Sequence, residues 1–243
     1  MSAQREIVLD TETTGFEPES GDRIVEIGAI ELIGHVPTGR TYHQYINPQR
    51  SMPAEAFGIH GIGPDILDPP QRPEPGQQTL LDKPLFKEVG QAFLDFVGDA
   101  KLVIHNAAFD MKFPNAELKW IGLPQLPWDR AVDTLAIAKR RFPGAGNSLD
   151  ALCRRFGIDN TQRTLHGALL DSEILADVYL ELIGGRQPDL VLAGPARRTT
   201  EAGSDWKPRP RPTPLAPRLT EEEAAAHAAF VEAMGDGAVW KTL

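Results

Sequence analysis

The first third of the chain carries the pattern of β-strands. An apolar run at 7–9 leads directly into Asp10-Thr11-Glu12, and further strand patterns follow at 23–33 and 41–46, with a break at 34–39. Three successive strands with short connections predict an antiparallel meander. After them, the segment 55–62 shows no clear period and is expected to be irregular, and the proline-rich segment 68–76 to be an exposed loop.

From residue 84 onward the apolar positions recur mainly at helical spacing. One more buried strand is expected at 101–105, and Pro114 is expected to divide the helix that follows Asn106 into two pieces. Strands followed by helices with another strand among them predict a mixed sheet covered by helices. The helices are expected at 84–97, from about 107 to beyond 114, at 133–141, at 149–156 after the cap Ser148, and at 167–183.

Acidic residues stand where these elements end or face the core. Side chains alternate along a strand, so Asp10 and Glu12 project to the same side. Asp110 follows the strand at 101–105, and Asp171 lies on the apolar stripe of the helix at 167–183, while Asp177 points elsewhere. A carboxylate on a core-facing stripe needs a partner, so this pattern favours a functional site over a solvated strand end.

Composition limits the function classes. The 243 residues include 25 basic and 34 acidic ones, a net charge of −9, which argues against a protein held to nucleic acid mainly by its bulk charge. The single cysteine, Cys153, excludes an intramolecular disulfide and a cysteine zinc site, and is expected to pack in the core. No apolar stretch approaches the roughly 18 residues of a membrane span, and a cytoplasmic protein is expected.

The composition changes near residue 186. Residues 186–218 contain seven prolines and a net charge of +4, which predicts a flexible linker after a folded domain at 1–185. Residues 219–243 carry a net charge of −4 and begin with Thr220-Glu221-Glu222-Glu223, a capping-box start for an alanine-rich helix. Its few large apolar residues, with Trp240 behind them, cannot form a core alone, so we expect this segment to dock on another protein.

The acidic residues have the chemistry of a metal site. Converging carboxylates favour hard divalent cations such as Mg²⁺ or Mn²⁺ over zinc. Two such cations can stabilise both the attacking and the leaving oxygen at a phosphodiester. His166, at the start of the helix that carries Asp171, is placed to take the proton of the attacking water. His105 is expected to pack or to form a hydrogen bond, and Asn106 either to orient substrate or to cap the turn.

Three segments resemble the motifs of the DnaQ-like 3′→5′ exonucleases, histidine subgroup: Asp10-Thr11-Glu12, His105 to Asp110, and His166 to Asp171. Segments 55–62 and 147–153 are similar to those of the proofreading (epsilon) subunits of bacterial DNA polymerase III. The resemblance spans residues 6–185 and implies an α/β, ribonuclease H-like fold with a five-stranded mixed sheet.

The resemblance also implies roles for individual residues. Asp10, Glu12, Asp110 and Asp171 would hold two divalent cations, with His166 as the general base. Three of these carboxylates would also contact the substrate, those of Asp10, Glu12 and Asp171. Further substrate contacts would come from Thr11, Glu55, Ile59 and His60. The partners would be a frayed DNA 3′ end, the polymerase catalytic (alpha) subunit through residues 219–243, and a small theta-like subunit, at the replisome on the nucleoid.

Residues 187–192 resemble the short glutamine-led peptides that dock on the sliding clamp. Gln187, Leu190 and Leu192 would fill the clamp's polar and apolar pockets, and Trp240 would contact the polymerase. Two other functions remain as alternatives. One is a freestanding exoribonuclease of the same fold. The other, less favoured because all five catalytic groups are present, is an adaptor without activity between polymerase and clamp.

Overall fold

The computed structural model describes residues 4–163, 165–184 and 219–235. The chain divides into two units near residue 191, and each is described by itself. The predicted linker at 186–218 and the clamp-type peptide at 187–192 lie outside the described residues. No described helix is long and apolar enough to cross a membrane.

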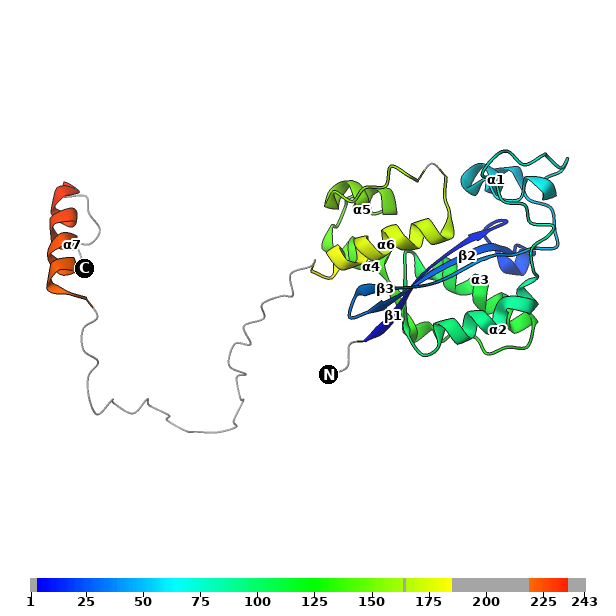
Figure 1. Ribbon diagram of the computed structural model, residues 1–243, viewed down its shortest axis with the longest axis horizontal. Coiled ribbons are helices and arrows are strands. Elements are labelled where there is room, and N and C mark those ends of the chain that lie inside the picture. The colour runs from blue at the N-terminus through cyan, green and yellow to red at the C-terminus, as the bar shows by residue number, and fades with distance from the viewer. Residues whose placement is uncertain (1–3, 164, 185–218, 236–243) are drawn as a thin grey trace, which may run out of the picture. The chain divides into compact units, whose positions relative to one another are not determined.

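The first unit is built on one five-stranded mixed sheet (Figure 1). Its order is β3-β2-β1-β4-β5, in which β1 pairs antiparallel with β2 and parallel with β4. The meander β1-β2-β3 and the five-stranded mixed sheet are therefore confirmed. The strands are β1 Arg5–Thr13, β2 Ile24–Ile33, β3 Val36–Tyr45, β4 Lys101–Ile104 and β5 Ala131–Asp133.

Helices cover both faces of this sheet, and single-turn 3₁₀ helices occur at Pro18–Ser20, Pro64–Ile66 and Trp128–Arg130. The helix expected at 149–156 is confirmed, with Ser148 as its N-cap and Gly157 beyond its end. The α-helices of this unit are α1 Ala54–His60, α2 Phe86–Val97, α3 Ala107–Trp120, α4 Thr134–Arg141, α5 Leu149–Phe156 and α6 Ala168–Leu182.

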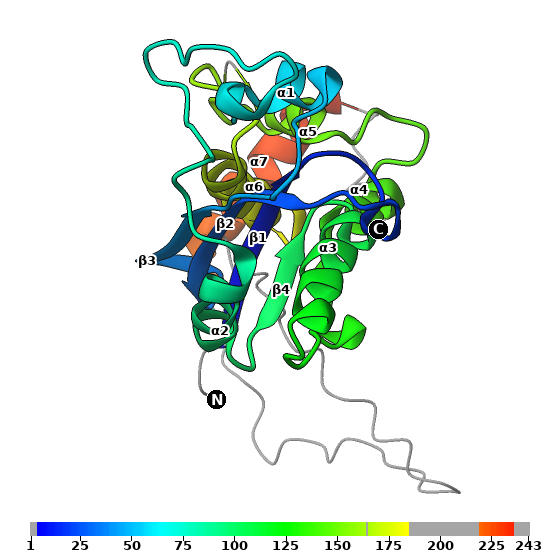
Figure 2. The same cartoon turned by 90° about the vertical axis from the view of Figure 1, so that its right-hand side faces the viewer.

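Alternation along β1 separates the two faces. Ile7 and Leu9 pack with α2 and α3 in one core cluster, whereas Val8 packs with α6 in another. Figure 2 shows β1 beside β4 at the centre of the sheet. Because Asp10 and Glu12 continue the face of Val8, they point toward α6, which carries Asp171.

Three sequence expectations need correction, and one strand was missed. Residues 55–62 are not irregular, since 54–60 form α1, and the break expected at 34–39 is only a tight turn at Gly34 and His35, both with positive φ. Pro114 does not divide α3, which is buried on both sides of it at Phe113 and Asn115, so packing overrides the lost backbone bond. The three-residue strand β5 was too short to show a pattern.

The close contact between β2 and α6 depends on Gly28. A Cβ at this position would stand 2.2 Å from the backbone of Ala168 and Leu169, and the Ser172 hydroxyl donates a 3.0 Å hydrogen bond to the Gly28 carbonyl. We expect Gly28→Ala to push α6 off the sheet and to destabilise the fold by about 1–3 kcal/mol or more.

Urea unfolding of Gly28→Ala checks this expectation. Gly58→Ala is the matched control, because a Cβ there meets nothing within 4 Å and Gly58 lies within α1. The control should be neutral or slightly stabilising. Equal stability of the two variants would contradict the role given to Gly28.

The second unit contains α7 Glu221–Ala233. The predicted capping box is confirmed, since Thr220 and Glu223 exchange side-chain to backbone hydrogen bonds. Phe230 and Met234 are exposed, and no residue of the helix is buried. Alone, this helix has no apolar core to stabilise it.

Candidate active site

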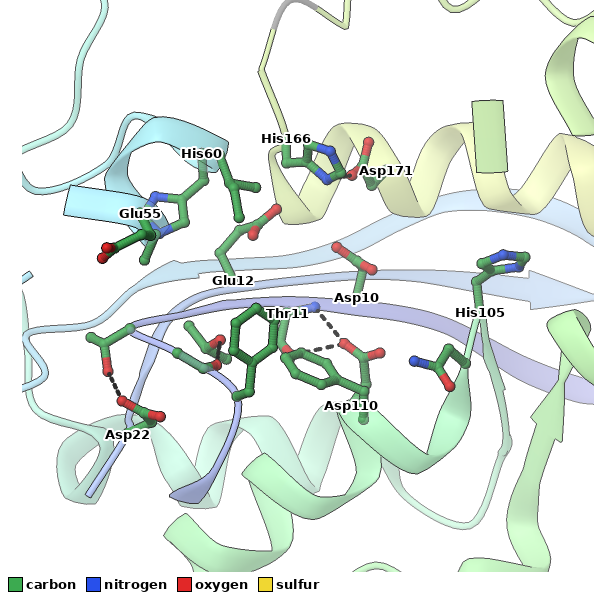
Figure 3. A pocket seen from close by; sticks show the side chains of 18 of the residues that line it. Asp10, Thr11, Glu12, Asp22, Glu55, His60, His105, Asp110, His166 and Asp171 are labelled. Carbon is green, nitrogen blue, oxygen red and sulfur yellow. Dashed lines mark hydrogen bonds and ion pairs between the residues drawn. The ribbon is translucent and has the colours of Figure 1, made fainter. Parts of the chain in front are cut away.

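A cavity of about 760 Å³ opens at the carboxyl end of β1 (Figure 3). It lies where β1, α1, α3 and α6 contribute side chains. Every predicted site residue within the described part of the chain lines it: Asp10, Thr11, Glu12, Glu55, Ile59, His60, Asp110, His166 and Asp171. Gln187, Leu190, Leu192 and Trp240 lie outside the described residues.

Asp10 and Glu12 lie above β1 in Figure 3, on the side of His166 and Asp171. Burial raises the pKa of both carboxyls well above the usual range, and neighbouring carboxylates add to the rise. For Asp10 the largest such neighbour is Asp110, and for Glu12 it is Glu26. Both carboxyls therefore need a positive charge or a proton.

Asp110 lies on the opposite side of β1, in the first turn of α3. Its Oδ1 accepts two hydrogen bonds from Thr11, from the backbone N at 3.1 Å and from the hydroxyl at 2.8 Å. Burial raises the pKa of Asp110 to about 7, and the bonds from Thr11 oppose the rise. Thr11 thus fixes the Asp110 carboxyl against the strand.

The raised pKa of Asp110 predicts a pH dependence of stability. Without metal, the folded protein keeps this proton up to about pH 7, whereas the unfolded chain loses it near 3.8. Relative to Asp110→Asn, the wild type should lose about 1.4 kcal/mol per pH unit as the pH rises between these values, and then level off. The measurement is urea unfolding of both proteins in EDTA at several pH values.

Asp177→Asn is the control for that experiment, because Asp177 is exposed on α6. The difference between wild type and this control should not change over the same range. A flat difference for Asp110→Asn as well would show that the carboxyl ionises normally in the fold.

Helix α1 forms another wall of the cavity with Glu55, Ile59 and His60. Ile59 is 43% exposed, so its apolar surface faces the opening. His60 is buried, and its Nδ1 accepts a hydrogen bond from the Ile62 backbone N. Burial lowers the pKa of His60 to about 4, so a neutral imidazole stands in this wall.

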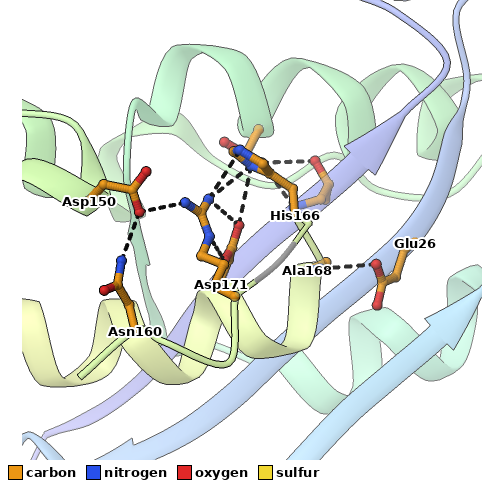
Figure 4. A network of polar contacts seen from close by, with 9 residues as sticks. Glu26, Asp150, Asn160, His166, Ala168 and Asp171 are labelled. Atoms are coloured by element: carbon orange, nitrogen blue, oxygen red, sulfur yellow. Dashed lines mark hydrogen bonds and ion pairs between the residues drawn. The ribbon is translucent and has the colours of Figure 1, made fainter. Parts of the chain in front are cut away.

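His166 and Asp171 meet in a polar network at the start of α6 (Figure 4). One possible metal-ligand atom each from Glu12, His166 and Asp171 lies within 4.8 Å of the other two. Asp10 and Asp110 line the cavity outside this cluster. His166 is half exposed, and its pKa is lowered by partial burial and by the nearby Arg163 charge. A neutral imidazole at physiological pH follows.

Two contributors to the site were missed in the sequence. Glu26 is buried opposite Glu12 in the β1–β2 register, and its Oε2 accepts a 3.0 Å hydrogen bond from the Ala168 backbone N at the start of α6. Arg163 forms a bidentate ion pair with Asp171. Glu26 could have been noticed in the sequence, because it is a charged residue inside an apolar strand. No sequence pattern distinguishes Arg163.

The donor set fits divalent cations. Carboxylate oxygens with one imidazole suit hard or borderline ions, and burial raises the pKa of three of the carboxyls, so that their ionised forms need a compensating charge. Asp10, Glu12, Asp110 and Asp171 are the residues that could hold the ions. His105 instead shares a 2.9 Å hydrogen bond with the Thr134 hydroxyl, and Cys153 is buried without a catalytic partner in the described structure.

Comparison with known proteins supports the family resemblance found in the sequence. Residues 7–179 match the family model described as "Exonuclease". DNA polymerase III subunit epsilon of Rickettsia felis is 44% identical over 238 residues, which cover 96% of this chain and 98% of that protein. The protein of the same name from Escherichia coli K12 is 41% identical, with 98% and 97% covered.

Solved structures agree on the fold. Exonuclease X in complex with a 5′-overhanging duplex DNA has a TM-score of 0.52 and 25% identity, covering 73% of this chain and 90% of that one. The nuclease domain of 3′hExo, a DEDDh family member bound to rAMP, has a TM-score of 0.58 at 20% identity, covering 74% and 92%. The chain belongs to the exonuclease family and, within it, to the group of DNA polymerase III epsilon subunits.

Proposed function

We propose that this chain is the proofreading subunit of a replicative DNA polymerase, a 3′→5′ exonuclease that removes mispaired nucleotides from DNA 3′ ends. The observation that carries this proposal is one cavity lined by Asp10, Glu12, Asp110, His166 and Asp171, in a chain that matches subunit epsilon of DNA polymerase III over 96% of its length. Enzymes of this family depend on divalent metal ions, for which we propose Mg²⁺ or Mn²⁺.

The four carboxylates would hold the ions, and these would offset the charge that develops on the phosphodiester oxygens. His166 takes the proton of the attacking water, for which its imidazole must be neutral, as its lowered pKa favours. Thr11 positions Asp110 through its two hydrogen bonds. The remaining wall, Glu55, Ile59 and His60 on α1, would contact the terminal nucleotide.

The cavity's volume of about 760 Å³ is in the range that holds a small ligand such as a single nucleotide. A frayed strand end would place its last nucleotide there. Because a mispaired end melts more cheaply than a paired one, it would be hydrolysed faster.

The test is a 5′-labelled primer–template with a paired or a mispaired 3′ end, beside RNA of the same sequence, in Mg²⁺ or in EDTA. Faster loss of the mispaired DNA end, abolished by EDTA, is expected. Efficient RNA digestion without response to the mismatch would instead identify an RNA-trimming enzyme. No metal-dependent product from folded protein would leave an adaptor without activity.

The proposed organisation is an exonuclease domain at 1–185, a linker at 186–218 and a polymerase-binding segment at 219–243. In support, α7 exposes Phe230 and Met234 without a core of its own. Deletion of 219–243 should abolish co-purification with the polymerase catalytic subunit, and an intact complex would refute this. A small theta-like accessory subunit is a further proposed partner.

Residues 187–192 are proposed as the clamp-binding peptide. Substitution of Gln187, Leu190 and Leu192 by alanine together should weaken binding to the sliding clamp. Unchanged clamp affinity would refute it, with the unmodified chain measured in parallel.

A further inference from the structure

Arg163 is a buried cation inside the proposed metal site. Its side chain is 8% exposed, and its guanidinium binds Asp171 in a bidentate manner, with Nε donating to Oδ1 and a terminal nitrogen donating to Oδ2 at 2.7 Å. The other terminal nitrogen donates to Oδ1 of Asp150 at 2.8 Å. Both oxygens of a proposed metal ligand are therefore already bound by a positive group.

The same guanidinium also binds the proposed general base. A terminal nitrogen of Arg163 lies 2.9 Å from Nδ1 of His166 and 3.4 Å from Nε2, so it stands beside the imidazole and near both ring nitrogens. The guanidinium therefore holds a positive charge directly against the group that is proposed to accept the proton of water. In this arrangement the charge opposes protonation of the imidazole.

We propose that Arg163 is an internal counter-cation that competes with the divalent metal for Asp171 and, when displaced, moves its charge away from the His166 imidazole. The proposal rests on the metal dependence proposed above. A cation beside buried carboxylates lowers their mutual repulsion, so Arg163 stabilises the metal-free fold. The same charge repels an incoming cation and occupies the side of the carboxylate that faces it.

Asp150 gives the displaced guanidinium a place to remain. It lies in the first turn of α5, its side chain is 44% exposed, and its Oδ1 accepts a 3.0 Å hydrogen bond from the Asn160 amide. Arg163 can release Asp171 and His166 while it keeps its bond to Asp150, so its charge stays paired. Metal binding therefore exchanges one cation for another at Asp171.

The test measures metal binding directly, without nucleic acid. Mn²⁺ is titrated into the metal-free full-length protein, and free Mn²⁺ is followed by electron paramagnetic resonance. Arg163→Gln should bind Mn²⁺ roughly tenfold more tightly than the wild type, because a competing charge is gone. Arg163→Lys keeps the charge but loses the two-pronged contact, so its affinity should fall between the two.

Arg155→Gln is the matched control, because it also replaces an arginine by glutamine and removes one positive charge. Arg155 lies on α5, where it donates a hydrogen bond to the Gly146 carbonyl and lies over the Phe142 ring. The Mn²⁺ affinity of this variant should equal that of the wild type. A second readout is the ¹⁵N signal of the Arg163 Nε–H, identified by its loss in Arg163→Lys, which should shift when Mg²⁺ is added to the wild type.

Four results would overturn the proposal. Equal or weaker Mn²⁺ binding by folded Arg163→Gln would make Arg163 only an organiser of the site. If that variant does not fold, wild-type affinity in Arg163→Lys, or an Nε–H signal unmoved at saturating Mg²⁺, would decide against it. Absence of Mn²⁺ binding by the wild type would refute both this proposal and the proposed function. If the proteins bind Mn²⁺ with the expected affinities but the wild type does not hydrolyse DNA, only the proposed function is refuted.

Discussion

Asp10→Asn should abolish hydrolysis of a mispaired DNA 3′ end, with a loss of roughly a thousandfold or more, and should raise the stability of the metal-free protein. Burial and the carboxylates around it raise the pKa of Asp10, so its ionised form is held at a cost in the fold. Asparagine keeps the shape and removes the charge. The two effects have one origin, because the repulsion that destabilises the metal-free site is what a divalent cation would relieve.

Two measurements check this prediction. Initial rates on the labelled primer give the loss of activity, and thermal unfolding in EDTA and in Mg²⁺ gives stability. The wild type should melt higher in Mg²⁺ than in EDTA, whereas the variant should melt higher than the wild type in EDTA and respond little to Mg²⁺. Asp177→Asn, the same change at an exposed position of α6, should alter neither. A variant less stable than the wild type in EDTA would contradict the argument.

The positions of the carboxylates could be predicted because they follow from local periodicity. Alternation along a strand placed Asp10 and Glu12 on one face, and the helical stripe placed Asp171 inward. The structure agrees: Asp171 and Glu12 are buried and share a cluster with His166. Such patterns report which face a residue occupies, so they suffice wherever a site is built from whole elements.

The remaining features depend on contacts between distant segments. Arg163 stands in a polar loop whose sequence resembles any solvated loop, and its role follows only from the position of Asp171 relative to that loop. Pro114 was expected to break a helix on local grounds, yet the side chains on either side of it are buried and α3 continues. A charge within an apolar strand marks Glu26 as unusual, but its position opposite Glu12 depends on the β1–β2 register, which no single strand reveals.

His166→Ala should reduce the rate by about 10²–10⁴-fold and should remove one limb of the pH profile. The imidazole acts as a base only when neutral, and partial burial and the Arg163 charge lower its pKa below 6.5. The decline of wild-type activity on acidification should therefore begin at a lower pH than it would for an ordinary imidazole. In the variant this decline should vanish, provided that metal is saturating at every pH.

The test of this role is the rate on the mispaired primer across pH, with and without added imidazole. Because His166 is 49% exposed, the space that alanine leaves is open to solvent, and free imidazole should restore part of the activity in its neutral form. His105→Ala is the matched control, since His105 lines the same cavity but is bound to Thr134, and it should cost less than about tenfold. Activity of His166→Ala within tenfold of the wild type, or an equal loss in His105→Ala, would transfer the base to another group. Rescue by imidazole that follows the protonation of imidazole itself would place the proton transfer at the position of His166.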